Sequence, residues 1–190
     1  SFMNLIIFGP PGAGKGTQAD FIVKKYNLYQ LSTGAVLRNE IKNVTELGKE
    51  ISSIINSGTL VSDEIVKKLV ENFISDNKYK DRLIFDGYPR NLIQAKTLNE
   101  LLSKYNQKID LVLKLSVSLE TIKKRISERR TLEKRADDSE DIAIKRFKTY
   151  EKSTEPVIEY YKKLDLLKVI DGERSIDQIN KEIRDIIALI

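Results

Sequence analysis

The sequence has no cysteine and no histidine among its 190 residues. Without cysteine there is no disulfide framework and no thiol nucleophile, and a cytoplasmic location is the expected one. Without histidine there is no Ser-His-Asp triad, and the two absences together remove the usual zinc ligands. The chemistry that remains rests on Lys, Arg, Asp, backbone amides and bound Mg²⁺. Phosphoryl transfer suits that set, because it depends on positioning and charge neutralisation.

Long apolar runs are also missing, since no stretch approaches the roughly 20 residues that span a bilayer. Apolar residues still make up 41% of the chain and charged residues 32%, which predicts a compact core with a well-solvated surface. The net charge of +5 and the pI near 9.2 are compatible with nucleic acid, anionic lipid or polyphosphate ligands. Acidic residues are interspersed among the lysines, so an ordinary solvated surface accounts for most of this charge.

Short apolar runs alternate with longer segments of helical period. The runs, which read as parallel strands covered on both faces, are 5–8, 83–85, 109–115 and 166–170. The predicted helices cover 15–26, 46–56, 63–75, 91–105, 119–130, 139–163 and 176–189. Ser175 with Gln178 predicts a capping box for the last helix, and Pro156 predicts a kink or a break in the long one. This alternation favours a doubly wound parallel sheet with helices on both faces.

A P-loop follows the first apolar run, where Gly9 to Thr17 read GPPGAGKGT. Glycines let backbone N–H groups turn inward around a phosphate, and the following helix adds its N-terminal amides and dipole. Lys15 is expected to reach the β- and γ-phosphates as a mobile charge. The predicted ATP-binding residues here are Gly12, Ala13, Gly14, Lys15, Gly16 and Thr17. Because Gly16 replaces the Ser or Thr that usually follows the lysine, a direct hydroxyl contact to Mg²⁺ is not expected.

Three further segments specify the reaction class: 31–38 (LSTGAVLR), 58–63 (GTLVSD) and 85–90 (FDGYPR), with Gln94 beyond. Together with the P-loop they resemble the nucleoside monophosphate kinases, and the adenylate kinase family in particular, over essentially the whole chain from Met3. One position departs from that family, because Ala35 stands where an aspartate is common.

The resemblance implies an acceptor site for AMP. Arg38 and Arg90 would grip the acceptor phosphate, and Asp86 would orient Mg²⁺ through water, with no direct protein ligand to the metal. Gln94 would read the adenine edge, because an amide can donate to a ring nitrogen and accept from the exocyclic amine at once. The predicted AMP-binding residues are Thr33, Arg38, Thr59, Leu60, Val61, Gly87, Tyr88, Pro89, Arg90, Gln94, Arg135 and Arg146.

A second implication concerns a set of arginines that would close over the triphosphate and stabilise charge in the transition state. Arg125 and Arg129 stand four residues apart, on one face of a predicted helix. Both are predicted to bind ATP, as is Arg174 in the last loop. The residues predicted to act in catalysis are Lys15, Asp86, Arg90, Arg125, Arg129, Arg135 and Arg146.

The fold implied by the resemblance is a single domain of residues 1–190, a three-layer α/β P-loop fold with a central five-stranded parallel sheet. A small helical AMP-binding lobe at about 32–61 and a short lid loop at about 130–137 would be inserted in it. The implied activity is reversible, Mg²⁺-dependent transfer of the ATP γ-phosphoryl group to AMP, giving two ADP. A cytoplasmic monomer that binds ATP, AMP and ADP, without nucleic acid or membrane partners, is expected.

Three alternatives stay open at this level. A UMP/CMP kinase would share the fold, and only Thr33 and Gln94 favour adenine over a pyrimidine. A non-catalytic nucleotide-binding protein would not need the arginine set. A nucleic-acid-binding module would fit the pI, but the sequence offers no aromatic stacking platform or reading helix.

Overall fold

The computed structural model describes residues 2–56, 61–133 and 140–190. The strands are β1 (Leu5–Phe8), β2 (Tyr29–Ser32), β3 (Leu83–Asp86), β4 (Leu111–Ser116) and β5 (Leu167–Asp171). The helices are α1 (Lys15–Tyr26), α2 (Thr33–Lys42), α3 (Glu46–Asn56), α4 (Asp63–Ile74), α5 (Leu92–Lys104), α6 (Leu119–Glu133), α7 (Glu140–Lys163) and α8 (Ile176–Ile187), with a 3₁₀ turn η1 (Asn77–Tyr79).

The five strands form one parallel sheet in the order β2-β3-β1-β4-β5, which confirms the predicted sheet. Asp86, the last residue of β3, is in register with Ile7 of β1 and with Ser32, the last residue of β2. These strands therefore finish at one edge of the sheet. In open parallel sheets that carboxyl edge is where ligands bind.

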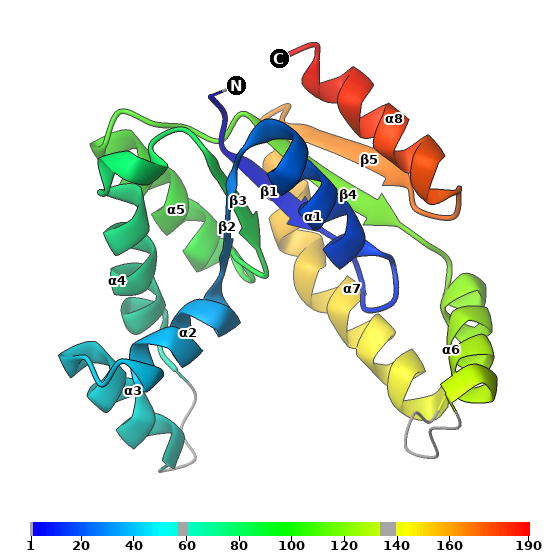
Figure 1. The fold of residues 1–190 in the computed structure, drawn as a ribbon, viewed down its shortest axis with the longest axis horizontal. Coiled ribbons are helices and arrows are strands. Elements are labelled where there is room, and N and C mark those ends of the chain that lie inside the picture. Colours follow the sequence, from blue (N-terminus) through cyan, green and yellow to red (C-terminus); the bar gives the residue numbers. More distant parts are fainter. Residues whose placement is uncertain (1, 57–60, 134–139) are drawn as a thin grey trace.

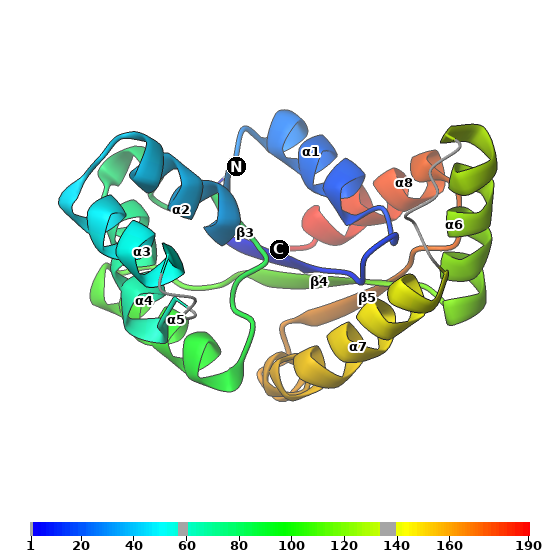
Figure 2. The ribbon, with the colours of Figure 1, turned by 90° about the horizontal axis from the view of Figure 1, so that it is seen from below.

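Successive side chains of β1 point to opposite faces of the sheet, and the core accordingly has two parts, one on each face. Leu5 and Ile7 pack with apolar residues of α1 and α8. Ile6 and Phe8 pack with apolar residues of α4, α5 and α7. Figure 2 shows the sheet nearly edge-on, with α1 and α8 on one side and α5 and α7 on the other. The predicted three-layer architecture is thus confirmed.

Most predicted elements are present, and the differences have local causes. β2 and α2 were not predicted as elements. β2 reads YQLS, so polar residues interrupt it and it presents no apolar run. α7 stays a single helix through Pro156, so a break there is wrong. The fully buried Val157 and Tyr161 hold the helix beyond the proline against the sheet. The capping box of Ser175 and Gln178 is present at the start of α8.

Two groups of helices extend past the carboxyl edge of the sheet. Figure 1 shows α2 and α3 on one side of that edge, and α6 with the first part of α7 on the other. The P-loop lies at the same edge, between them. Within the described ranges, no helix combines the length and the apolar character that crossing a bilayer requires.

Candidate active site

The loop between β1 and α1 has the backbone that the glycine pattern predicts. Gly12 and Gly14 have φ angles of 88° and 84°, in the left-handed region that strains any residue with a Cβ. Between them, the Ala13 N–H donates to the Pro10 carbonyl at 3.0 Å and closes a turn. Gly14 precedes α1 without a side chain to cap it. The first amides of α1 and the positive end of its dipole therefore suit an anion.

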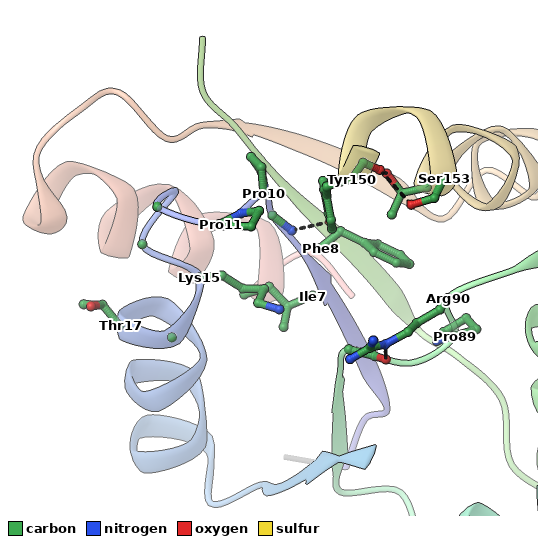
Figure 3. Close-up of a pocket in the computed structure, with 16 residues that line it drawn as sticks. Ile7, Phe8, Pro10, Pro11, Lys15, Thr17, Pro89, Arg90, Tyr150 and Ser153 are labelled. Atoms are coloured by element: carbon green, nitrogen blue, oxygen red, sulfur yellow. Dashed lines mark hydrogen bonds between the residues drawn. The ribbon is translucent and has the colours of Figure 1, made fainter. Parts of the chain in front are cut away.

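A pocket of about 500 Å³ lies against this loop. It is lined by Ile7, Phe8, Gly9, Pro10, Pro11, Gly12, Gly14, Lys15, Gly16, Thr17, Gly87, Pro89, Arg90, Tyr150, Ser153 and Thr154. The lining comes from the P-loop with the start of α1, from the segment after β3, and from α7 (Figure 3). Three segments distant in sequence thus meet at the carboxyl edge of the sheet.

Lys15 is tied to the end of β3. Its Nζ lies 2.6 Å from Asp86 Oδ1, while the Gln30 side-chain amide donates to Asp86 Oδ2 at 2.8 Å. The carboxylate therefore has a donor on each oxygen and a fixed orientation. The structure brings together the P-loop lysine and the aspartate that were predicted from separate motifs.

Arg90 comes to the same pocket from the opposite side. Its Nε donates to the Gly87 carbonyl at 2.7 Å, across a turn that contains the cis Tyr88–Pro89 peptide. In Figure 3 the Lys15 and Arg90 side chains extend toward one another. The site thus presents two cations, one from each predicted half, to a single space.

Tyr150 of α7 is a site residue that the sequence reasoning missed. The backbone N–H of Gly9, the first P-loop residue, donates to the Tyr150 hydroxyl at 2.8 Å. Burial raises the pKa of Tyr150 far above its usual value, so the hydroxyl stays neutral. The two residues are 141 positions apart, and no local pattern links them. This contact anchors α7 to the start of the phosphate loop.

Arg125 of α6 also contacts the P-loop. Its guanidinium donates to the Gly12 carbonyl at 2.6 Å and to the Gly172 carbonyl at 3.0 Å. It therefore joins α6, the P-loop and the loop after β5. Arg174 of that last loop forms an ion pair with Glu182 of α8. Its side chain is thus engaged away from the phosphate loop.

The remaining predicted residues come from α2, from α7 and from the segments before α4 and after β3, or lie outside the described part. Thr33 is buried at the start of α2, while Arg38 of α2 and Arg146 of α7 are exposed. Val61 precedes α4 and is half-buried, and Tyr88 is fully buried. Thr59, Leu60, Arg135 and the side chain of Arg129 lie outside what the structure describes. Of the residues predicted for the acceptor half, the structure thus describes Thr33, Arg38, Val61, Arg146 and those of the 87–94 segment.

Comparison with known proteins decides the family. A family model for adenylate kinase matches residues 7–166. The chain belongs to the adenylate kinase family. It is 46% identical over 211 residues to the adenylate kinase of Pelagibacter ubique (strain HTCC1062), with 97% of this chain and 99% of that protein covered. The adenylate kinase of Prochlorococcus marinus (strain MIT 9301) is 44% identical over 182 residues, which covers 95% of this chain and 96% of that protein.

Membership of the adenylate kinase family makes the chain a nucleoside monophosphate kinase, which is a phosphotransferase. The alignment with the Pelagibacter relative is longer than the 190 residues of this chain, so that relative has residues with no counterpart here. The Prochlorococcus relative aligns over 182 residues. Family members thus differ in length, and this chain is of the shorter kind.

Proposed function

We propose that this member of the adenylate kinase family transfers the γ-phosphoryl group of ATP to AMP, reversibly and with Mg²⁺, to give two ADP. The observation that carries this proposal is the convergence of Lys15, Asp86 and Arg90. Lys15 and Arg90 line one pocket, and Asp86 is paired with the lysine. Cations from the donor and acceptor halves that face one space are suited to two phosphate chains placed end to end.

ATP would lie on the P-loop, with its β-phosphate against the loop amides and Lys15. The AMP phosphate would lie between Arg38 and Arg90, with Gln94 at the adenine. The attacking phosphate oxygen is already anionic at neutral pH, so no general base is required, and the absence of histidine is no obstacle. Lys15 and the arginines would neutralise charge on the transferring group, in a site from which closure excludes water.

The residues at the end of β3 fit Mg²⁺. Asp86 offers a carboxylate at the carboxyl edge of the sheet, and Mg²⁺ prefers such oxygen ligands while keeping several waters. Asp86 would hold the ion through water, as Gly16 supplies no hydroxyl beside Lys15. When bound there, Mg²⁺ would neutralise negative charge on the phosphates of ATP during the transfer.

The other finer assignments belong to the same proposal. Arg135 of a short lid loop at about 130–137, with Arg125 and Arg129 before the loop and Arg146 after it, would close over the phosphates. The lobe at about 32–61 would bind AMP, and Arg174 and its loop would lie beside the ATP adenine. One chain supplies both halves of the site, which suits a monomer acting in the cytoplasm on ATP, AMP and ADP alone.

Acceptor selectivity is the test of this proposal. The protein is mixed with MgATP and separately with AMP, CMP, UMP or GMP, and diphosphate formation is followed. ADP formed with AMP, and little product with the others, is the expected result. Preference for CMP or UMP would replace the proposal by a pyrimidine monophosphate kinase. Nucleotide binding without any product would replace it by a non-catalytic binding protein.

A further inference from the structure

The Gln94 side chain is buried, and bonds hold the residue at four points. Its backbone N–H donates to Asn91 Oδ1 at 2.8 Å, and its backbone carbonyl accepts from the Tyr88 hydroxyl at 3.4 Å. In the side chain, Oε1 accepts from the Arg90 backbone N–H at 2.8 Å. Nε2 donates to Asp63 Oδ1, also at 2.8 Å. Only 9% of the residue is exposed, so few other conformations are open to it.

The two side-chain partners determine which way the amide faces. A backbone N–H can only donate, and an ionised carboxylate can only accept. A reversed amide would point its NH₂ at the Arg90 N–H and its oxygen at the Asp63 carboxylate. Both hydrogen bonds would then be replaced by repulsive contacts in a buried place. The carboxylate therefore opposes the reversed orientation strongly.

The side-chain bonds to Arg90 and Asp63 each use half of the hydrogen-bonding capacity of the amide oxygen or the amide nitrogen. One N–H and one oxygen lone pair of Gln94 remain for a ligand. Adenine offers an acceptor at N1 and a donor at its 6-amino group, which match that N–H and that lone pair. Hypoxanthine and guanine offer the opposite pattern, an N1–H donor and an O6 acceptor. Reading a 6-oxopurine would require the reversed amide.

We propose that Asp63 is a positioning residue that locks Gln94 in the adenine-reading orientation, and so disfavours 6-oxopurine monophosphates as acceptors. This inference rests on the proposed function, in which Gln94 faces the acceptor base. Asp63 would not touch the nucleotide. It is the first residue of α4, directly after the segment that leads out of the lobe, and the Asn91 amide also reaches its Oδ1, at 3.4 Å.

The direct test is Asp63→Asn, assayed with MgATP and either AMP or inosine 5′-monophosphate. These acceptors differ only at N1 and at the 6-position of the purine, so size does not enter the comparison. An asparagine can turn its own amide to donate to a reversed Gln94 oxygen, which relaxes one of the two constraints. The AMP-to-IMP ratio of kcat/KM should fall by about tenfold, mainly because IMP improves. The Arg90 N–H still favours adenine, so selectivity should persist in part.

The matched control is Glu64→Gln. Glu64 is the next residue in the first turn of α4, is exposed, and carries the same charge at the same helix end. Both variants lose a favourable charge–dipole interaction, so a loss of stability common to both belongs to the helix. The control should keep the wild-type AMP-to-IMP ratio within twofold. A folded Asp63→Asn protein that also keeps this ratio would overturn the proposal.

A second measurement covers the case in which Asp63→Asn does not fold. The side-chain amide protons of Gln94 are observed in ¹H–¹⁵N spectra of the wild type and assigned by their loss in Gln94→Glu. A locked amide should show slow exchange with water, whereas exchange as fast as that of exposed glutamines would contradict the lock. These spectra need no catalysis. Failure of the wild type to make ADP from AMP would therefore overturn the proposed function without deciding the lock.

Discussion

Lys15 and Asp86 connect the start of α1 to the end of β3 at the centre of the site. The lysine Nζ lies 2.6 Å from Asp86 Oδ1, and the two side chains are only 28% and 15% exposed. Since Gln30 donates to the other carboxylate oxygen, the aspartate is fixed, and it holds the lysine over the pocket. The Lys15 ammonium group lies beside the P-loop, so it can exchange the Asp86 carboxylate for a phosphate of the ligand without a large movement.

Replacement of Lys15 by Met should lower kcat by about 10²–10³-fold, because a preorganised charge beside the transferring group is lost. The fold should survive, since Lys15 lines the pocket, is partly exposed and belongs to neither part of the apolar core. Initial rates with saturating MgATP and AMP, and thermal unfolding, check both points. Lys24→Met is the control, because Lys24 is an exposed α1 residue that pairs with Asp20 of the same helix. Near-normal turnover in Lys15→Met would contradict the role assigned to Lys15.

Replacement of Tyr150 by Phe should raise the KM for ATP and lower the free energy of unfolding by about 1–3 kcal/mol. The phenylalanine keeps the ring but leaves the part-buried Gly9 N–H without its acceptor. Tyr160→Phe is the matched control, because the Tyr160 hydroxyl accepts from Asn99, away from the P-loop. Chemical denaturation and ATP titration should show a stability loss in both variants and a KM change in Tyr150→Phe alone.

The sheet was largely predictable because β1, β3 and β4 are buried apolar runs and most of β5 lies in the apolar run 166–170. The other edge strand, β2, escaped the pattern, since the polar Gln30 and Ser32 interrupt its apolar residues. α2 begins directly after it, at Thr33, inside a segment that the sequence identified as a motif and not as a helix. Apolar periodicity reports burial, so it is weakest where an element lies at the margin of the core.

The candidate site was predictable where residues belong to one motif and not where the fold brings distant residues together. Lys15, Asp86 and Arg90 each stand in a local signature. Contacts between motifs, or between a motif and a residue outside it, are not predictable in this way: Tyr150 meets the P-loop across 141 positions, and Asp63 meets Gln94 across 31. A hydrogen bond between such residues leaves no spacing or periodicity in the sequence.

Replacement of Gly48 by Ala should destabilise the lobe of α2 and α3 by about 1–3 kcal/mol. A Cβ at this position would lie 2.1 Å from the Glu40 carbonyl oxygen, where α3 crosses α2. Helix propensity alone predicts the opposite sign, since alanine favours a helix by about 1 kcal/mol over glycine. The KM for AMP should rise while that for ATP is unchanged. Ser53→Ala, at an exposed position of α3, should change neither stability nor KM.

Glu173 should make stability depend on pH. Hydrogen bonds from the Thr121 hydroxyl and then from Ser118 at the start of α6 lower the pKa of its carboxyl group below the usual value. A depressed pKa in the folded state means that the ionised form is the one stabilised. The contribution is present above the pKa of the unfolded state, and is lost as the pH falls through the lowered pKa of the folded state. Glu173→Gln should therefore be less stable than the wild type near pH 7, and the two should converge in acid. Urea unfolding of both proteins between pH 7 and pH 3 measures the difference, and a gap that stays constant over this range would show that the ionised carboxylate is not its source.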